Sequence, residues 1–194
     1  MTRGIKRVID LTVAASLLVV LSPLMLLIAL AVICESPGGA IFRQRRAGYR
    51  SREFDVVKFR SMRPGRPGDG HATGVRDPRI TRFGGFLRRT SLDELPQLLN
   101  VVKGEMSLVG PRPLLLPSLR PDELVRLETR PGITSLAAVS GRQSITWDER
   151  MALDRWYIEH WSLRLDMRIL ARTIPVTLKQ TGVYDADGEM KARS

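Results

Sequence analysis

The sequence has little cysteine and little histidine, and this scarcity limits the kinds of site that it can build. Cys34 is the single cysteine among 194 residues and lies in an apolar run, so a disulfide framework is excluded. The two histidines, His71 and His160, are isolated from each other, and no Cys/His cluster has the spacing of a zinc site. A metal bound to this protein would therefore be held by carboxylates, which favours Mg²⁺ or Mn²⁺.

Acidic residues are also scarce relative to basic ones. Lys and Arg total 31 and Asp and Glu total 20, which gives a formal net charge of +11. Such a surplus indicates a polyanionic partner, either nucleic acid, anionic lipid or nucleotide phosphate. The sequence has no recognisable nucleic-acid motif, and its few aromatic residues are mostly C-terminal. We therefore expect no nucleic acid among its partners.

A long apolar run lies near the N-terminus. Residues 8–34 are nearly all apolar, with Asp10 close to the start. At about 1.5 Å per residue, a helix of this length reaches roughly 40 Å, and the hydrocarbon core of a bilayer is about 30 Å thick. The length alone therefore permits a single tilted span.

Two features of this run favour a re-entrant helix instead. Ser22-Pro23 lies in the middle, where proline removes a backbone donor and the serine can bond a freed group. Both flanks are basic, and the positive-inside rule then places both ends in the cytoplasm; these residues are Arg3, Lys6 and Arg7 before the run, and Arg43, Arg45, Arg46 and Arg50 after it. We expect an anchor over residues 1–36 that is broken at Ser22 and Pro23.

Two alternatives compete with the re-entrant anchor. A spanning helix can carry a proline kink, so the proline alone is weak evidence. Ala29-Leu30-Ala31 resembles a signal-peptide cleavage site, but the run exceeds the usual apolar region of about 7–15 residues. The basic segment after the run would also make a poor secreted start. Cleavage is therefore not expected, and residues 37–194 are predicted to form a cytoplasmic domain.

The rest of the chain predicts a mixed α/β domain that is mostly helical. Residues 54–59 alternate as a short strand does, and residues 61–78 are a long loop rich in Gly, Pro and Arg. Helices are expected over residues 85–102, with an interruption near Pro96, and over residues 121–128. Thr146 and Glu149 fit a capping box that opens a helix running to about Trp161.

The C-terminal part has the character of an interfacial amphipathic helix. Four aromatic residues gather in one short region, as they do at membrane interfaces; they are Trp147, Trp156, Tyr157 and Trp161. Arg164, Arg168 and Arg172 are spaced by four and form one basic stripe, with apolar residues mostly off it. The alternative is an ordinary amphipathic core helix with a solvated basic face.

Asp93 and Glu94 are the strongest candidates for chemistry. They stand at or just before a predicted helix start, with either Ser91 as N-cap and Glu94 at N3, or Pro96 at the first helical position. The plain structural interpretation is a helix cap. The nearby arginines favour a magnesium-bound diphosphate, because guanidinium groups bind phosphate oxygens and a carboxylate holds the metal; they are Arg82, Arg88, Arg89 and Arg112. An ionised Asp is also a competent nucleophile without a general base.

Three segments around these residues resemble the bacterial sugar transferases, the monotopic polyprenyl-phosphate phosphoglycosyl transferases. The segments are Lys58-Phe59-Arg60-Ser61-Met62, Arg89-Thr90-Ser91-Leu92-Asp93-Glu94-Leu95-Pro96-Gln97-Leu98-Leu99-Asn100, and Ser107-Leu108-Val109-Gly110-Pro111-Arg112-Pro113. The central segment is very specific. Shorter matches extend from Lys6-Arg7 to Asp166, so the resemblance covers nearly the whole chain, which resembles the small, minimal-domain members.

The resemblance implies a function and a set of site residues. Asp93 would attack the β-phosphate of a UDP-sugar, release UMP and carry the phosphosugar to polyprenyl (undecaprenyl) phosphate, which starts a cell-surface glycan. Glu94 would bind Mg²⁺. The same resemblance implies that basic residues hold phosphates or nucleotide and that one acidic residue lines the site; these are Lys58, Arg88, Arg112 and Arg142, and Asp166. The enzyme would lie on the cytoplasmic face of the bacterial inner membrane.

The chain departs from the family pattern at one place. It has Ser135-Leu136-Ala137-Ala138 where the family usually has Gly-Leu-Trp-Gln, so we expect the sugar or nucleotide contacts there to differ from those of the family. Two other functions remain open at this point. One is a non-enzymatic, membrane-tethered basic protein that binds nucleic acid or another anionic partner. The other is an enzyme with the same donor and a soluble acceptor.

Overall fold

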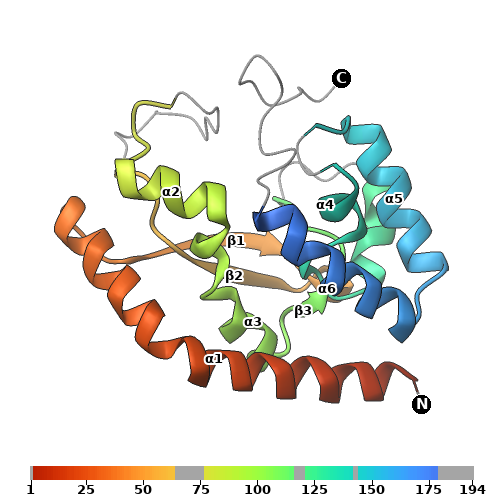
Figure 1. The fold of residues 1–194 in the computed structure, drawn as a ribbon. Coiled ribbons are helices and arrows are strands. Elements are labelled where there is room, and N and C mark those ends of the chain that lie inside the picture. Colours follow the sequence, from red (N-terminus) through yellow and green to blue (C-terminus); the bar gives the residue numbers. More distant parts are fainter. Residues whose placement is uncertain (1, 64–76, 116–120, 142–143, 179–194) are drawn as a thin grey trace.

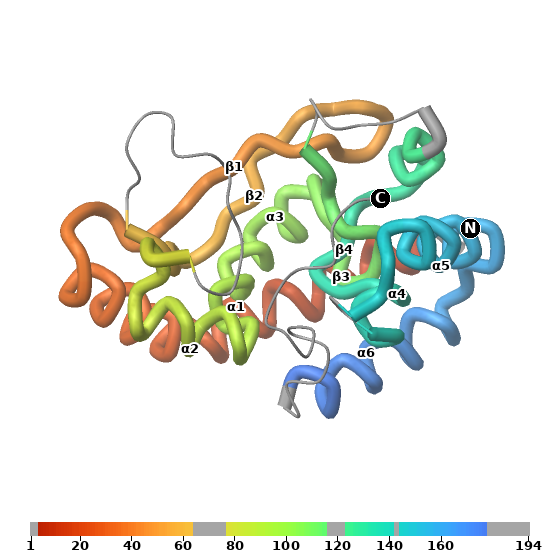
Figure 2. The backbone as a smooth tube through the Cα atoms, turned by 90° about the horizontal axis from the view of Figure 1, so that it is seen from above, coloured from red at the N-terminus to blue at the C-terminus, as the bar shows by residue number. Residues whose placement is uncertain are grey.

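The longest element is an N-terminal helix that underlies the rest of the molecule. A computed structural model describes residues 2–63, 77–115, 121–141 and 144–178. Helix α1 (Thr2–Glu35) is long and apolar enough to cross a membrane, and most of its large apolar side chains are exposed. It ends at the bend formed by Ser36-Pro37-Gly38. Figure 2 shows α1 crossing beneath α3 (Gln97–Lys103) and β3 (Ser107–Val109).

Helix α1 continues through Ser22-Pro23, so the sequence pair does not interrupt it. Pro23 has no N–H, and the carbonyl of Val19, four residues earlier, therefore loses its usual helical donor. The Ser22 hydroxyl donates to that carbonyl at 2.8 Å. The predicted role of the serine is confirmed. The helix runs along the bottom of Figure 1 and turns upward toward α2 (Arg82–Thr90), as a bend within one helix.

Both ends of α1 contact the same body of the protein. Near the start, Lys6 donates to the Asp166 carboxylate at 2.6 Å. At the other end, the Glu35 carboxylate accepts a hydrogen bond from the Phe83 N–H at 2.8 Å, which helps to cap α2. Just before that end, Ile28 and Val32 pack with Phe59 and Leu87. The two ends of the apolar helix are thus both attached to the domain formed by the rest of the chain.

The domain contains two small two-stranded sheets. Strand β1 (Ile41–Ala47) pairs antiparallel with β2 (Glu53–Phe59), with Phe42 opposite Lys58, and a short helix η1 (Tyr49–Ser51) joins them. Strand β2 confirms the predicted strand, whereas β1 was not predicted because its three arginines were interpreted only as flanking charge. Strand β3 pairs parallel with β4 (Gly132–Thr134).

The helices largely follow the sequence patterns. The predicted helix over residues 85–102 is α2, a short helix η2 (Leu92–Glu94) and α3, and the interruption lies at Ser91, whose φ of 58° ends α2. Residues 121–128 form the helix η4 (Pro121–Glu128), which precedes α4 (Leu136–Ser140). The Thr146 capping box opens α5 (Trp147–Glu159), as predicted. Most of the predicted loop lies outside the described residues.

The C-terminal helix α6 (Leu163–Leu178) keeps its basic stripe exposed and buries Ile169. The aromatic residues that were predicted to lie at a membrane interface do not share one environment. Trp156 is exposed and stacks on His160, whereas Tyr157 is almost fully buried in the core with Leu98 and Met106. Tyr157 therefore has a packing role in place of the interfacial one that its position in the sequence suggested.

Candidate active site

The acidic pair lies in the single turn of η2 between α2 and α3. Ser91 makes no capping hydrogen bond to η2, so the predicted capping box with Glu94 is not formed. Pro96 directly precedes α3 as its N-cap instead of occupying the first helical position. Both expected registers are therefore wrong in detail. The left-handed conformation of Ser91 ends α2, and the following turn of η2 places Glu94 beside β2 and the loop after β3.

Glu94 is held by two cations from separate parts of the chain. Its Oε1 accepts a hydrogen bond from Lys58 Nζ of β2 at 2.8 Å and from Arg112 Nη2 of the loop after β3 at 3.0 Å. Lys58 and Arg112 were both predicted as site residues from the family-like segments. They lie 36 and 18 residues from Glu94 in the sequence, and the fold brings all three together. The result is a compact charged cluster with Glu94 at its centre.

Asp93 has different surroundings from its neighbour. It is buried, and within the described residues its carboxylate forms no hydrogen bond or ion pair. Burial and the adjacent Glu94 raise the pKa of Asp93 to about 6, against the opposing influence of Lys58 and Arg112. Burial also acts to raise the pKa of Glu94, but Lys58 and Arg112 outweigh it and lower that pKa to about 2. At neutral pH, Asp93 is therefore the more basic carboxylate of the pair and is still mostly ionised.

Arg112 is itself held in place by a buried ion pair. Its backbone carbonyl accepts a hydrogen bond from Arg126 Nη2 of η4 at 2.8 Å. That guanidinium pairs with Asp154 of α5 at 2.8 Å, and both side chains are 2% exposed. Close backbone contact supports the same loop, because a Cβ on Gly110 would lie 2.3 Å from the Arg130 carbonyl oxygen. The loop that presents Arg112 is thus supported from two sides.

A hollow beside Glu94 contains two polar residues that the sequence patterns did not single out, Arg46 and Gln97. Burial and the nearby Arg112 lower the pKa of Arg46 to about 10. In the sequence, Arg46 was one charge of a basic flank. The sequence pattern that could have identified Arg46 is the alternation within residues 41–47. This alternation places Gln44 and Arg46 on the less exposed face of β1. Gln97 stands within the family-like motif, one turn beyond the acidic pair.

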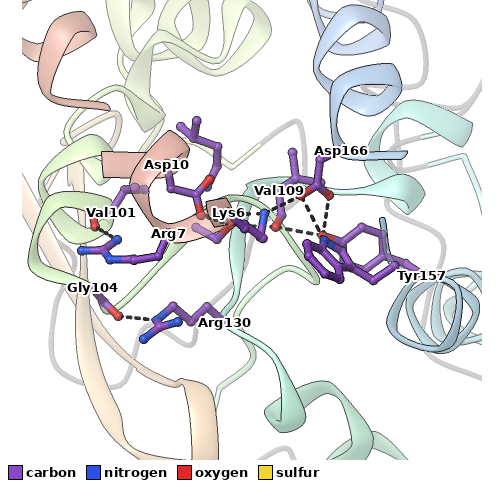
Figure 3. A network of polar contacts seen from close by, with 12 residues as sticks. Lys6, Arg7, Asp10, Val101, Gly104, Val109, Arg130, Tyr157 and Asp166 are labelled. Carbon is purple, nitrogen blue, oxygen red and sulfur yellow. Dashed lines mark hydrogen bonds and ion pairs between the residues drawn. The ribbon is translucent and has the colours of Figure 1, made fainter. Parts of the chain in front are cut away.

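The other predicted site residues are placed as follows. Arg88, in the last turn of α2, contributes to the electrostatic environment of Asp93. Arg142 lies outside the described residues. Asp166 belongs to a separate cluster, shown in Figure 3, where its buried carboxylate accepts hydrogen bonds from Lys6, Tyr157 and Trp161. In the described structure this carboxylate ties α6 to α1 and α5.

The residues at the family departure have structural roles. The Ser135 side chain accepts a hydrogen bond from the Ala138 N–H at 3.0 Å and caps α4. Ala137 is completely buried. A large aromatic side chain at position 137 would not fit this packing without rearrangement. The small residues of this chain are therefore matched to its own local packing.

The carboxylates at the site fit a shared magnesium ion and not a complete protein cage. Among the described residues, no three His, Cys, Asp or Glu side chains gather to hold a metal. Mg²⁺ is commonly held by one or two carboxylates together with substrate phosphates. Glu94, next to cations suited to phosphate, fits the role of such a carboxylate.

Comparisons with known proteins show the family to which this chain belongs. A family model for bacterial sugar transferases matches residues 1–180. The UDP-glucose:undecaprenyl-phosphate glucose-1-phosphate transferase of Caulobacter vibrioides is 44% identical, over 92% of this chain and 72% of that protein. The exopolysaccharide production protein ExoY of Rhizobium meliloti is 39% identical, over 92% of this chain and 88% of that protein.

Larger relatives share the same region. The undecaprenyl-phosphate galactose phosphotransferase of Salmonella typhimurium is 39% identical over 94% of this chain, which spans 42% of that protein. The match thus includes the apolar helix, the acidic pair, the strand that carries Lys58 and the loop that carries Arg112. This chain is therefore a transferase of the bacterial sugar transferase family.

Proposed function

We propose that this protein transfers a sugar phosphate from a UDP-sugar to polyprenyl (undecaprenyl) phosphate, releases UMP and thereby starts a cell-surface glycan. The observation that carries the proposal is the contrast within the acidic pair. Asp93 is buried and free of bonded cations among the described residues, whereas Glu94 is bound by Lys58 and Arg112. One carboxylate is available to attack, and the other organises the charges around it. Names of relatives support the substrate classes.

The reaction is proposed to run in two displacements at phosphorus. An oxygen of the Asp93 carboxylate attacks the β-phosphorus, and the bond to the bridging oxygen breaks. UMP leaves with that electron pair, and an acyl phosphate bearing the sugar remains on Asp93. An oxygen of polyprenyl phosphate then attacks the same phosphorus, and the acyl oxygen leaves, which regenerates the carboxylate. Covalent catalysis of this kind splits one displacement into two steps, and UMP departs before lipid binds.

The basic residues are proposed to bind the substrates' phosphates. Lys58 and Arg112 hold Glu94 and face the same hollow, so they are placed to neutralise charge on the diphosphate. Arg88 and Arg142 are proposed to contribute similarly. Mg²⁺ is proposed to be shared by Glu94 and the donor diphosphate, where it would neutralise charge on the phosphate oxygens.

We further propose that α1 is a re-entrant helix and that the domain lies on the cytoplasmic face of the bacterial inner membrane. The contacts of Lys6 and Glu35 support this arrangement, because a straight span would leave its two ends on opposite sides of the bilayer. The exposed arginine stripe of α6 suits an anionic lipid surface. Membership of a transferase family argues against a non-enzymatic basic protein.

Intact-protein mass after mixing with a UDP-sugar alone tests the covalent step. The wild type is expected to gain the mass of one phosphosugar and to release UMP without lipid. Asp93→Asn keeps the side-chain shape but removes the anionic nucleophile, so it should show neither result. Initial rates with both substrates should be ping-pong. An adduct that persists in Asp93→Asn, or kinetics that require donor and acceptor to bind together, would refute the assignment of Asp93.

A further inference from the structure

Among the residues that the structure describes, the Gln97 amide nitrogen is buried beside Glu94 and has no hydrogen-bond partner. The residue is 3% exposed. Its Nε2 makes no hydrogen bond to any residue that the structure describes. A buried donor without an acceptor is unfavourable, and most buried polar atoms in native proteins are paired. This nitrogen is therefore a candidate for binding a group from outside the chain.

The surroundings of Gln97 select an anionic ligand. Gln97 lines the hollow in which Lys58, Arg112 and Arg46 stand against the single carboxylate of Glu94. Three cations and one anion leave an excess of positive charge. The hollow is partly open to solvent, and its excess of basic side chains suits a fragment such as a diphosphate.

Asn100, an amide on the same helix, has a structural role and serves as a comparison for Gln97. Asn100 lies one turn after Gln97 and is 1% exposed. Its Oδ1 accepts from the Val57 N–H at 3.1 Å, and its Nδ2 donates to the Asp55 carbonyl and to Glu105, each at 2.7 Å. Asn100 thereby fastens α3 to β2. The Gln97 nitrogen contributes nothing comparable within the described residues, so its burial is not explained by attachment of the helix.

We propose that the Gln97 amide nitrogen donates a hydrogen bond to a phosphate oxygen of the donor's diphosphate. Gln97 follows Glu94 by three residues, so the two side chains lie on the same side of the chain and line one hollow. A neutral donor adds a phosphate contact beside the carboxylates without a further charge. This inference rests on the proposed function, since it takes a UDP-sugar as the ligand.

The test uses the whole 194-residue chain in membranes and the variant Gln97→Met, which keeps the length of the side chain and removes the donor. The second-order rate constant for UMP release should fall about 10- to 100-fold, the range for one hydrogen bond to a charged group. The inhibition constant of UDP, which has the diphosphate and no sugar, should rise by a similar factor. The melting temperature should stay unchanged or increase, because no protein partner is lost.

Two further variants make the result decisive. Asn100→Ala is the matched control and should lower the melting temperature, because its amide is fully bonded. Gln97→Glu has nearly the size of glutamine, but its carboxylate repels phosphate, so it should lose at least as much UDP affinity as Gln97→Met. It replaces Gln97→Met if that variant does not fold.

Three results would overturn the assignment, and each has a separate meaning. Wild-type UMP release and UDP inhibition in both Gln97 variants would remove Gln97 from the site. Slower turnover with unchanged UDP inhibition would indicate a sugar hydroxyl as the acceptor instead of phosphate. If the wild-type protein releases UMP from no UDP-sugar, the proposed function itself fails.

Discussion

Two adjacent carboxylates acquire different chemistry from their surroundings. Lys58 and Arg112 both bond Glu94, which keeps it anionic, whereas burial makes Asp93 the stronger base. A carboxylate that two cations already neutralise is a poor nucleophile, because attack would require it to give up those bonds. The difference between the pair therefore arises from which neighbours the fold supplies, although the two side chains carry the same functional group.

The substitution Glu94→Gln tests the metal role of this residue. The amide would keep the shape of the side chain but lose the charge that Lys58, Arg112 and Mg²⁺ share. We expect UMP release to fall by about 100-fold or more, as when one preorganised charge contact is removed, with partial recovery at raised Mg²⁺. The measurement is a Mg²⁺ titration of UMP release in both proteins.

Chelation is the control for that titration. Exhaustive removal of divalent metal should abolish the activity of the wild type, and added Mg²⁺ should restore it. Full activity after chelation, or a Glu94→Gln variant with the same Mg²⁺ dependence as the wild type, would contradict a metal role for Glu94.

The elements around the site are held by buried polar contacts between η4, α5 and the loop of Arg112. Arg126 bonds the Arg112 carbonyl and pairs with Asp154, and both charges are almost fully buried. Removal of one member of such a pair leaves an uncompensated charge, which costs about 3–5 kcal/mol. The same contacts orient Arg112 toward Glu94, so stability and activity are linked through Arg126.

A pair of variants separates these two effects. Arg126→Met should lower the free energy of unfolding by about 3–5 kcal/mol, because Asp154 is left without this cation. The double variant Arg126→Met/Asp154→Leu removes both charges and should recover most of that stability. Its UMP release should stay below that of the wild type, because the Arg112 carbonyl still lacks its donor. Denaturant unfolding and UMP release measure the two quantities, and full activity in the double variant would show that Arg126 does not position Arg112.

At the scale of the whole molecule, α1 is attached to the domain at both ends and exposes apolar side chains between them. Arg7 strengthens the first attachment, since it donates to the carbonyls of Val101 and Val102 at the end of α3 (Figure 3). Asp10 extends it by accepting from the Ser107 hydroxyl at 2.7 Å. A domain fixed in this way can lie against one face of a membrane, with the middle of α1 in the lipid.

Cysteine labelling tests this topology. Single cysteines at position 3 and position 50, in the Cys34→Ala background, should both resist a membrane-impermeant reagent applied to the periplasmic side. Pro23→Leu restores the missing backbone donor and should favour a straight span, which moves the N-terminus outward and exposes position 3 to the reagent. The cysteine at position 50 is the control and should stay protected. Periplasmic labelling of either position without the Pro23 substitution would contradict the re-entrant arrangement.

Local patterns in the sequence determined much of this protein. Four predicted features depend on neighbours within a few residues, and the structure confirms them: the apolar helix, the hydrogen bond of Ser22 to a freed carbonyl, the strand over residues 54–59 and the Thr146 capping box. The predicted break at Ser22-Pro23 is not confirmed, because the helix continues through it. The motifs likewise identified Asp93, Glu94, Lys58 and Arg112 as one group. Short-range periodicity and capping chemistry are written into the order of the residues.

Only the tertiary structure decided how the site residues differ in environment and which further residues lie beside them. Several features depend on segments that are distant in sequence. They are the left-handed turn at Ser91, the different bonding of Asp93 and Glu94, and the position of Asp166 apart from the Glu94 ion pairs. The Gln97 nitrogen, unpaired within the described structure, is a further example. A side chain's charge state and hydrogen bonds are set by burial and by the groups that folding brings within about 4 Å. Sequence spacing shows which residues are present. Which residues they bond is determined by the contacts between α1, β2, α3 and the Arg112 loop.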